Sequence, residues 1–244
     1  MNTQQYFKEI EKKTKEIYAV AEEARGKGLD PADKVEIPLA RSLAEKVVGL
    51  IATVYPQMTD SGIVERIIEL EKKFGKLDPA VCLQIAEETA KQKFCKFASL
   101  KEAIEAGART GIAYITLGVV SSPIEGLTEI KIVKTKEGKE YFSPYFSGPM
   151  RSAGGSSTAF SLVIIDYLRE LFGYAKYDPR EEEINRSAVE LHDYHERITN
   201  LQYMPTDEET KFLARHLPIQ VNGEPSEVIE VSNYKNLERI DTNY

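Results

Sequence analysis

The stretch that most limits the fold runs from Ala106 to Val120, where apolar residues cover almost every face of an expected helix. A helix with one apolar stripe lies on a surface, whereas a helix that is apolar all round must be surrounded by other elements. Ser99 is a good N-cap, and Glu102 follows at the third helical position in the capping-box pattern. We therefore expect a helix from Ser99 to Val120 near the centre of the core.

Four further helices are predicted before this central one, because apolar residues repeat there at three- and four-residue spacing. Their ends carry start and stop signals, such as Gly75 after one helix and the pair Asp78-Pro79 before the next. Residues 1–120 therefore read as a helical part. The four helices are expected over 3–25, 39–54, about 63–74 and 78–93.

The pattern changes at Ser121-Ser122-Pro123, and two alternating segments follow on either side of a turn that contains Gly138. These segments, 127–134 and 140–146, predict a β-hairpin. More helices are expected over 157–172, from 181 onward and from 206 to 217, and then a second short hairpin formed by 219–221 and 228–231. The predicted fold is α+β and predominantly helical, with a mixed part over 121–244 that is either a separate domain or continuous with 1–120.

Charge and cysteine content exclude several classes of protein. The net charge of the 244 residues is −7, so any contact with nucleic acid must come from a local basic patch. Cys82 and Cys95 stand far apart without a CxxC pattern, which favours free thiols in a reducing cytoplasm over a disulfide or a zinc site. The longest apolar stretch, 111–120, is too short to cross a bilayer, so no membrane partner is expected.

The residue patterns give no support for a catalytic or metal-binding centre. His192 and His195 are three apart on an expected helix, but HExxH is absent and His216 belongs to another element. The acidic runs at 181–183 and 207–209 fall in first helical turns, where solvated carboxylates complement the helix dipole. We therefore expect no catalytic residue and no metal ligand in this chain.

The most unusual segment, 141–158, places three glycines, two prolines and one arginine between a strand and a helix. Glycines permit close backbone approach, and free N–H groups at the start of a helix can hold an anion. Arg151, Ser152, Gly154 and Gly155 are therefore candidate ligands of a phosphate group, although the spacing is not that of a P-loop. A buried structural turn explains the same residues, and the sequence leaves both interpretations open.

A second candidate surface is the expected hairpin. Basic residues there outnumber acidic ones and stand beside four aromatic residues, a combination that suits contact with a nucleic-acid backbone and its bases. The candidate DNA-binding residues are Lys131, Lys134, Lys136 and Lys139. A solvated hairpin with buried aromatics explains the same pattern. Arg109 differs from these residues, because it lies beside the most apolar helix and is expected to pair with a carboxylate or a backbone carbonyl.

The segment 141–159, YFSPYFSGPMRSAGGSSTA, resembles the YFxGPxRSAGGT signature of the large subunit of the archaeal family D DNA polymerases. The resemblance extends along the whole chain and includes the opening segment from Tyr6 to Ile51, the apolar stretch from Ala108 to Leu127 and the closing segment from Leu201 to Asn243. Ser156-Ser157 departs from the signature, which tends to have threonine there, and this weakens any assigned role for that hydroxyl.

The resemblance implies a place in a two-subunit replicative polymerase. In that family the small subunit carries a 3′–5′ exonuclease, and the large subunit binds catalytic Mg²⁺ on barrels far downstream of the matched region. The chain is therefore expected to be a non-catalytic fragment without a cofactor of its own. Its expected partners are the small subunit, primer-template DNA and a second copy of itself. Two alternatives remain: a protein-interaction scaffold without DNA contact, and a stand-alone phosphate-handling enzyme built on the glycine-rich segment.

Overall fold

The computed structural model describes residues 2–29, 40–118, 121–147, 150, 156–225, 228 and 230–241. The chain forms two compact units, Met1–Pro38 and Leu39–Tyr244. The boundary expected near Ser121 lies inside the second unit, and that division of the chain stays a prediction.

The first unit contains the helix α1 (Thr3–Gly26). Asn2 caps it, because its side chain accepts from the Gln5 N–H at 2.9 Å while the Gln5 side chain accepts from the Asn2 N–H. No residue of α1 is buried. The helix therefore lacks the packing that stabilises most helices in folded proteins.

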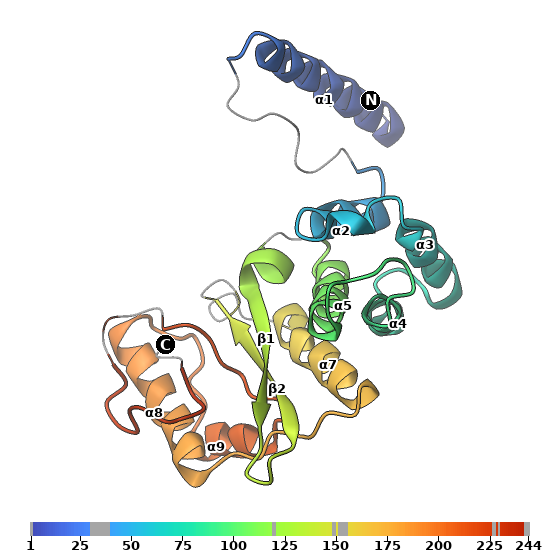
Figure 1. The fold of residues 1–244 in the computed structure, drawn as a ribbon. Helices are drawn as coiled ribbons and strands as arrows, with labels where there is room; N and C mark the ends of the chain where they lie inside the picture. The colour runs from blue at the N-terminus through green and yellow to red at the C-terminus, as the bar shows by residue number, and fades with distance from the viewer. Residues whose placement is uncertain are drawn as a thin grey trace. The chain divides into compact units, whose positions relative to one another are not determined.

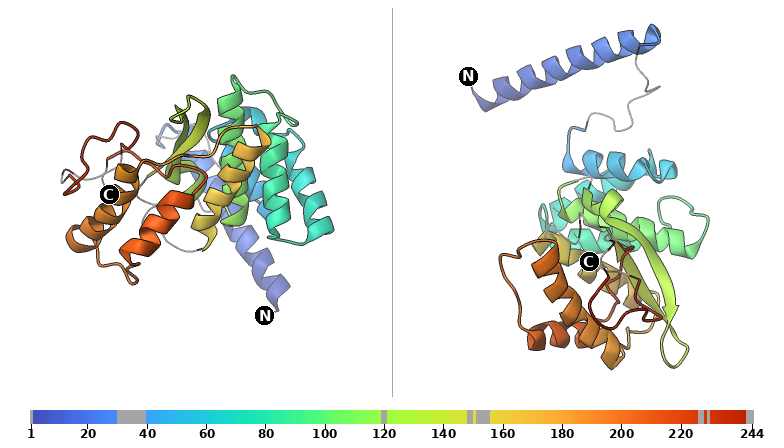
Figure 2. Two further views of the ribbon diagram at one scale, coloured as in Figure 1. Left: turned by 90° about the horizontal axis from the view of Figure 1, so that it is seen from below. Right: turned by 90° about the vertical axis from the view of Figure 1, so that its left-hand side faces the viewer.

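The second unit begins with helices that pack around one central helix. They are α2 (Leu43–Ala52), the 3₁₀ turn η1 (Pro56–Met58), α3 (Ile63–Phe74), α4 (Pro79–Ala90), α5 (Leu100–Ile115) and α7 (Ser156–Leu171). Helix α5 contacts α2, α4 and α7, as Figures 1 and 2 show, and its residues from Ala106 to Tyr114 are all buried. Gly107 lets α4 approach closely, because a Cβ there would lie 2.5 Å from the Ala86 carbonyl oxygen. The expected core helix is thus confirmed.

Helix α5 ends at Ile115, earlier than the sequence predicted. Leu117 and Gly118 adopt left-handed backbone angles, with φ of 59° and 67°. The Gly118 N–H reaches back to the Ala113 carbonyl at 2.7 Å and the Leu117 N–H to the Tyr114 carbonyl at 3.2 Å, which is a Schellman-type end. The prediction that the helix includes 116–118 was wrong, because the apolar run continues past the end of the helix. Residues 119–120 lie outside the described residues.

A β-hairpin follows the π-helical turn η2 (Ser121–Gly126). Its strands β1 (Leu127–Lys134) and β2 (Glu140–Phe146) are antiparallel, with Ile130 opposite Pro144 and Lys134 opposite Glu140. Gly138 has a φ of 81° in the connecting turn, a conformation that favours glycine. The predicted hairpin and its turn are confirmed.

The last helices are α8 (Glu181–Arg197) and α9 (Asp207–His216), which contact each other. The hairpin contacts α5 and α7, and Figure 1 shows α8 on its other side. A predominantly helical α+β class is confirmed. Of the expected second hairpin, however, residues 219–222 run beside β2 instead: the N–H groups of Gln220 and Asn222 donate to the carbonyls of Phe142 and Pro144. Three residues of the stretch 225–230 lie outside the described residues.

Candidate nucleic-acid interface

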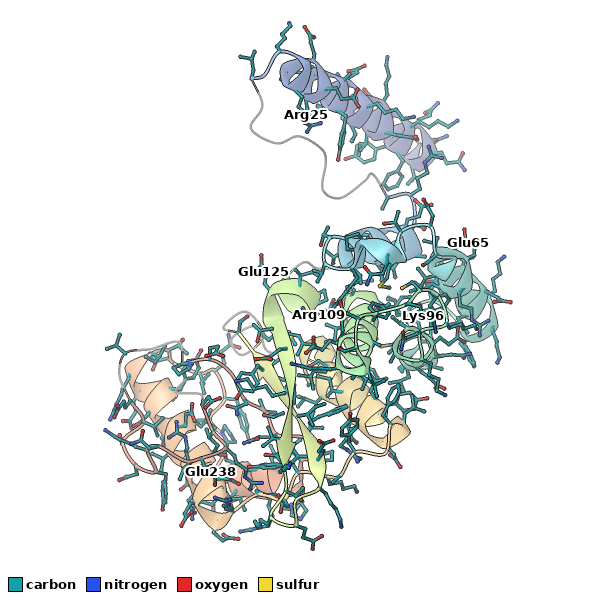
Figure 3. The ribbon with its side chains drawn as sticks, viewed as in Figure 1. Arg25, Glu65, Lys96, Arg109, Glu125 and Glu238 are labelled. Atoms are coloured by element: carbon teal, nitrogen blue, oxygen red, sulfur yellow. The ribbon has the colours of Figure 1, made fainter. Side chains whose placement is uncertain are left out.

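The hairpin is held in place by a buried arginine. Arg109 of α5 donates from Nη1 to the Pro123 carbonyl at 2.7 Å and from Nη2 to the Thr128 carbonyl at 2.7 Å. Only 6% of Arg109 is exposed, and Figure 3 shows it on α5, beside β1. Arg109 was expected to pair with a carboxylate or with a backbone carbonyl, and the structure shows pairing with backbone carbonyls. Arg109 therefore orients η2 and β1 and is not offered to an external phosphate.

Lys131 is the most constrained of the hairpin lysines. Its Nζ lies 3.8 Å from the centre of the Tyr145 ring and 3.4 Å from the Asp241 carboxylate. Burial, and then the hydrogen bond to Asp241, raises the pKa of Tyr145 to about 12, so its hydroxyl stays a neutral donor. Burial acts to lower the pKa of Lys131, but Tyr145 and Asp241 outweigh it and keep that pKa above its usual value. The charge of Lys131 is therefore paired with groups of the same chain.

The other three lysines lie toward the tip of the hairpin. Lys136 donates to the Pro179 carbonyl at 2.9 Å, and Lys139 pairs with the exposed Glu137 at 2.8 Å. Lys134 is exposed at the end of β1, opposite Glu140. Solvent screens an ion pair that is this exposed, so Lys139 could exchange Glu137 for a phosphate at little cost. Lys134 and Lys139 are thus the hairpin charges best placed to meet a polyanion.

The aromatic residues of β2 are not available to nucleobases. Tyr141, Phe142, Tyr145 and Phe146 are each at most 4% exposed. The Phe142 ring lies 4.5 Å from that of Tyr174, in contact with the segment that follows α7. The hairpin pattern had two interpretations, a nucleic-acid surface and a solvated hairpin with buried aromatics. For these four side chains the structure shows the second.

The glycine-rich segment is described only at its edges. Arg151, Ser152, Gly154 and Gly155 lie outside the described residues, so their proposed contact with phosphate stays a prediction. Before them, Ser147 donates from its N–H to the Gly126 carbonyl at 2.8 Å and from its hydroxyl to the Glu125 carbonyl at 2.6 Å. Helix α7 begins after them at Ser156. The segment therefore connects the hairpin base to a core helix.

A buried cluster that the sequence did not predict ties the C-terminal segment to α8. Arg239 is 7% exposed and donates to both oxygens of the Glu183 carboxylate, at 2.9 and 2.7 Å, and to Asp178 at 2.8 Å. Glu183 also accepts from the Arg180 N–H at 2.6 Å. Glu183 thus caps α8 as predicted but is 2% exposed, which corrects the expectation of a solvated cap.

Histidines and cysteines do not gather into a metal site in the described ranges. His192 Nε2 lies 2.9 Å from Asp207, and His195 Nδ1 accepts from the Leu201 N–H at 3.0 Å. Within those ranges no group of three or more His, Cys, Asp or Glu side chains could hold a metal ion. Burial raises the pKa of the Cys82 thiol to about 12, so this thiol stays protonated. In the same ranges, no helix is both long and apolar enough to cross a membrane.

Comparison with known proteins shows the family. Residues 5–244 match the family described as DNA polymerase II large subunit DP2, N-terminal. The DNA polymerase II large subunits of Nanoarchaeum equitans, Methanosarcina barkeri and Haloarcula marismortui are 43%, 39% and 38% identical over 98% of this chain, and the matches cover 19%, 20% and 16% of those proteins. The chain therefore spans about a fifth of the length of the curated relatives it matches, and it belongs to the N-terminal family of the DNA polymerase II large subunit.

Proposed function

We propose that the chain is the non-catalytic N-terminal module of a heteromeric, cytoplasmic archaeal replicative polymerase, where it supports subunit assembly and contacts DNA. The family match places it in the large subunit but covers only a fifth of the relatives' length. The catalytic Mg²⁺ ions would then bind to sequence outside these 244 residues. The associated 3′–5′ exonuclease would belong to the small subunit.

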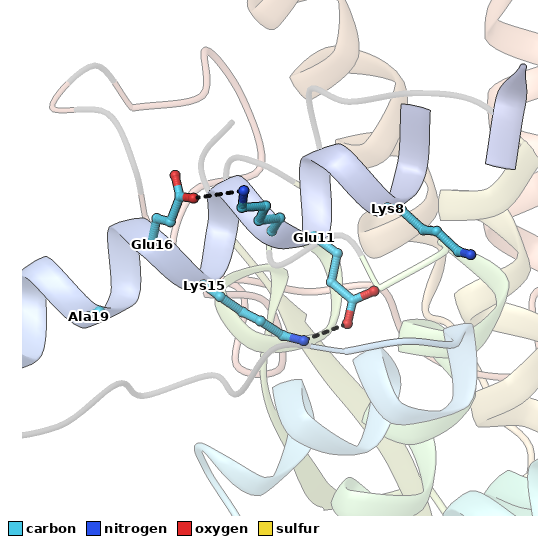
Figure 4. Close-up of a pocket in the computed structure, with 6 residues that line it drawn as sticks. Lys8, Glu11, Lys15, Glu16 and Ala19 are labelled. Atoms are coloured by element: carbon cyan, nitrogen blue, oxygen red, sulfur yellow. Dashed lines mark ion pairs between the residues drawn. The ribbon is translucent and has the colours of Figure 1, made fainter. Parts of the chain in front are cut away.

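The observation that supports a role in assembly is the exposed apolar face of α1. Tyr6, Ile10, Ile17 and Val20 are 53%, 42%, 69% and 67% exposed and follow each other at three-, four- and seven-residue spacing. The opposite face is charged, and Figure 4 shows its ion pairs Lys15–Glu11 and Lys12–Glu16. The depression drawn there is lined by residues of this one helix. An apolar stripe of this kind is typical of helices that associate with another helix.

This stripe fits the partners expected for assembly, which are a second copy of the chain or the small exonuclease subunit. In either case the apolar side chains leave water on association, and each fully covered side chain contributes about 1.5–3 kcal/mol. DNA contact is assigned separately to the second unit, through Lys134 and Lys139 of the hairpin and through the glycine-rich segment around Arg151. The scaffold alternative keeps the assembly role and omits the DNA contact.

A salt series with labelled DNA tests the DNA half of this proposal. The chain is expected to bind primer-template DNA in fluorescence anisotropy, with an affinity that falls steeply between about 50 and 200 mM salt. The double variant Lys134→Gln, Lys139→Gln should bind more weakly and lower the magnitude of the salt slope by about 2, because two phosphate contacts are removed. The matched control Lys12→Gln, Lys15→Gln removes the same charge from α1 and should bind like the wild type.

Two results would contradict the proposal. Absence of DNA binding by the intact chain at low salt would favour the scaffold alternative. Extension of a primer by the chain alone in the presence of Mg²⁺ and nucleotides would contradict its non-catalytic role. The scaffold alternative predicts association with protein partners in light scattering without any change in DNA anisotropy.

A further inference from the structure

The turn between α3 and α4 holds a cluster of lysines. In the described part of the chain, none of these lysines has an acidic partner. Lys72, Lys73 and Lys76 are exposed, and no ion pair is formed by any of them within those ranges. No acidic residue stands between Lys72 and Leu77. This differs from the hairpin, where Lys131 and Lys139 each lie within 4 Å of a carboxylate.

The carboxylates nearest to this turn in sequence are already engaged. Glu69 accepts from Arg66 at 2.6 Å, and Glu71 accepts from the Tyr114 hydroxyl at 3.1 Å. Asp78 accepts from the Ala80 N–H at 2.7 Å as the N-cap of α4. Within the described ranges, none of these carboxylates forms an ion pair with Lys72, Lys73 or Lys76.

Two large apolar side chains are exposed in the same turn. Phe74 is 37% exposed and Leu77 is 39% exposed. The Lys73 Nζ lies 4.5 Å from the centre of the Phe74 ring, so cation and ring form one surface. Lysines in the last turn of a helix complement its dipole, which accounts for Lys72 and Lys73. The dipole accounts neither for Lys76, which follows Gly75, nor for the exposed Phe74 and Leu77.

The turn is fixed from the core. Leu77 has a φ of 61°, a left-handed conformation that non-glycine residues rarely adopt. Its N–H donates at 2.9 Å to the hydroxyl of Tyr114, a fully buried residue of α5, and that hydroxyl donates to Glu71. This chain of contacts holds the strained residue in place. Strain of this kind occurs at binding sites, where it fixes the geometry before the ligand arrives.

We propose that the α3–α4 turn, Lys72–Leu77, is a contact site for a single strand of nucleic acid. The three ammonium groups would meet successive phosphates, and the exposed Phe74 and Leu77 would contact the faces of unpaired bases. Double-stranded DNA offers the phosphates but not the base faces, so the apolar pair favours the unpaired strand. This assignment rests on the proposed contact of the chain with DNA and adds a second surface to it.

The test uses the intact chain and a fluorescein-labelled oligothymidylate of about 20 nucleotides, with anisotropy measured from about 50 to 200 mM salt. The triple variant Lys72→Gln, Lys73→Gln, Lys76→Gln should lose at least tenfold in affinity. Its salt slope should fall in magnitude by about 2, since each phosphate contact on a single strand contributes about 0.7. The matched control Lys91→Gln, Lys93→Gln, Lys101→Gln removes three lysines that are ion-paired to Glu87, Glu88 and Glu129, and it should leave the slope unchanged.

A second pair of variants tests the apolar part. Phe74→Ala and Leu77→Asn should each weaken binding of the single strand by about fivefold or more without changing the salt slope. Binding of a duplex of the same length should not change. Asparagine is chosen because it tolerates the left-handed backbone at position 77, and unchanged urea midpoints would show that these variants are folded.

The outcomes separate the two proposals. If the wild-type chain binds no DNA at low salt, the proposed DNA contact and this site both fail. If the wild type binds and the triple lysine variant binds equally well with the same salt slope, the assignment of the α3–α4 turn as a binding site is wrong. The assignment of the hairpin then stands. If the turn variants lose affinity for an acidic protein partner but not for oligothymidylate, the turn serves protein association and the inference is wrong.

Discussion

The carboxylate of Glu88 joins α3 to α4. It accepts from Arg66 Nε and Nη2 at 2.9 and 2.7 Å, from Gln84 at 3.0 Å and from Lys93 at 2.9 Å. Burial raises the pKa of Glu88, but these hydrogen bonds outweigh it and lower the pKa to about 2 from an ordinary value of 4.5. Because the folded-state pKa is the lower one, the carboxylate stabilises the fold above pH 4.5. This contribution is lost as the pH falls toward 2.

Replacing Glu88 with glutamine should therefore destabilise the second unit by about 2 kcal/mol at pH 7, the typical size for lost hydrogen bonds to a charged group. Urea unfolding followed by circular dichroism at several pH values measures this difference. The gap between wild type and Glu88→Gln should shrink steadily below about pH 4.5 and vanish near pH 2.

Glu69 supplies the matched control for this prediction. It also pairs with Arg66, at 2.6 Å, but its side chain is 69% exposed, whereas that of Glu88 is 12% exposed. Solvent screens such a pair, so Glu69→Gln should cost at most about 0.5 kcal/mol. An equal loss for the two variants, or a gap that persists at pH 2, would contradict the assignment of the low pKa to the buried contacts.

The sequence could predict local residue roles but not distant partners. Ser99 and Asp78 cap α5 and α4 as predicted, because a cap depends on only three or four neighbouring residues. Glu183 was read as a solvated cap because its partner Arg239 lies 56 residues later. The contact of Lys131 with Asp241 was equally out of reach, since 110 residues separate the two in the sequence. Long-range ion pairs leave no periodic signal in a single sequence.

At the scale of elements, the segment from Leu237 to Asp241 is packed against the hairpin and α8 by polar contacts. The Gln220 and Asn222 side chains both donate to the Arg239 carbonyl, at 2.6 and 3.0 Å, while the Arg239 guanidinium binds Glu183 and Asp178. Burial acts to raise the pKa of Asp178, but the hydrogen bonds from Arg239 and from the Lys136 N–H, together with the charges of both residues, outweigh it and hold that pKa below its usual value. Arg239 is therefore the central residue of this junction.

The variant Arg239→Gln should destabilise the second unit by about 3 kcal/mol, because it leaves the buried Glu183 carboxylate without its counter-ion. Hydrogen exchange should increase most at residues 237–241 and at the Gln220 and Asn222 amides beside β2. Arg215→Gln is the comparison, since Arg215 pairs with Glu181 across an exposed surface and should contribute less than about 1 kcal/mol. A uniform rise in exchange across α2–α5 in place of a local one would argue against this junction.

Element types were predictable where one periodicity ran without interruption. The 3.6-residue pattern predicted α3 and α8, and the alternation around Gly138 predicted the hairpin. The prediction was wrong at residues 116–118, where an apolar run continues past a Schellman turn, because side-chain hydrophobicity does not report backbone handedness. It also paired 219–221 with the wrong strand, since a short apolar segment fits any open sheet edge and its neighbour is set by tertiary packing. The contribution of Arg151 to the site stays a prediction.

At the scale of the whole molecule, the chain forms two units that differ in how much of each is buried. The second unit has a buried core that includes α2, α4, α5 and α7, whereas α1 buries no residue in the first. Most helical stability in proteins comes from tertiary packing, so covering the apolar stripe of α1 would stabilise this helix. If that cover is a second copy of the chain, association and folding of α1 become one equilibrium that depends on protein concentration.

This coupling predicts how the chain responds to loss of the first unit. A chain starting at Leu39 should be monomeric in light scattering and should unfold at a midpoint independent of its concentration, because no core residue has been removed. The intact chain should run as a larger species, and helix content assigned to α1 should rise with concentration.

The double variant Ile10→Glu, Ile17→Glu should behave like the truncated chain, since it places charge on the apolar stripe. Lys8→Glu, on the charged face shown in Figure 4, should associate like the wild type. A monomeric intact chain would contradict self-association through α1, whereas association of the truncated chain would place the assembly surface on the second unit.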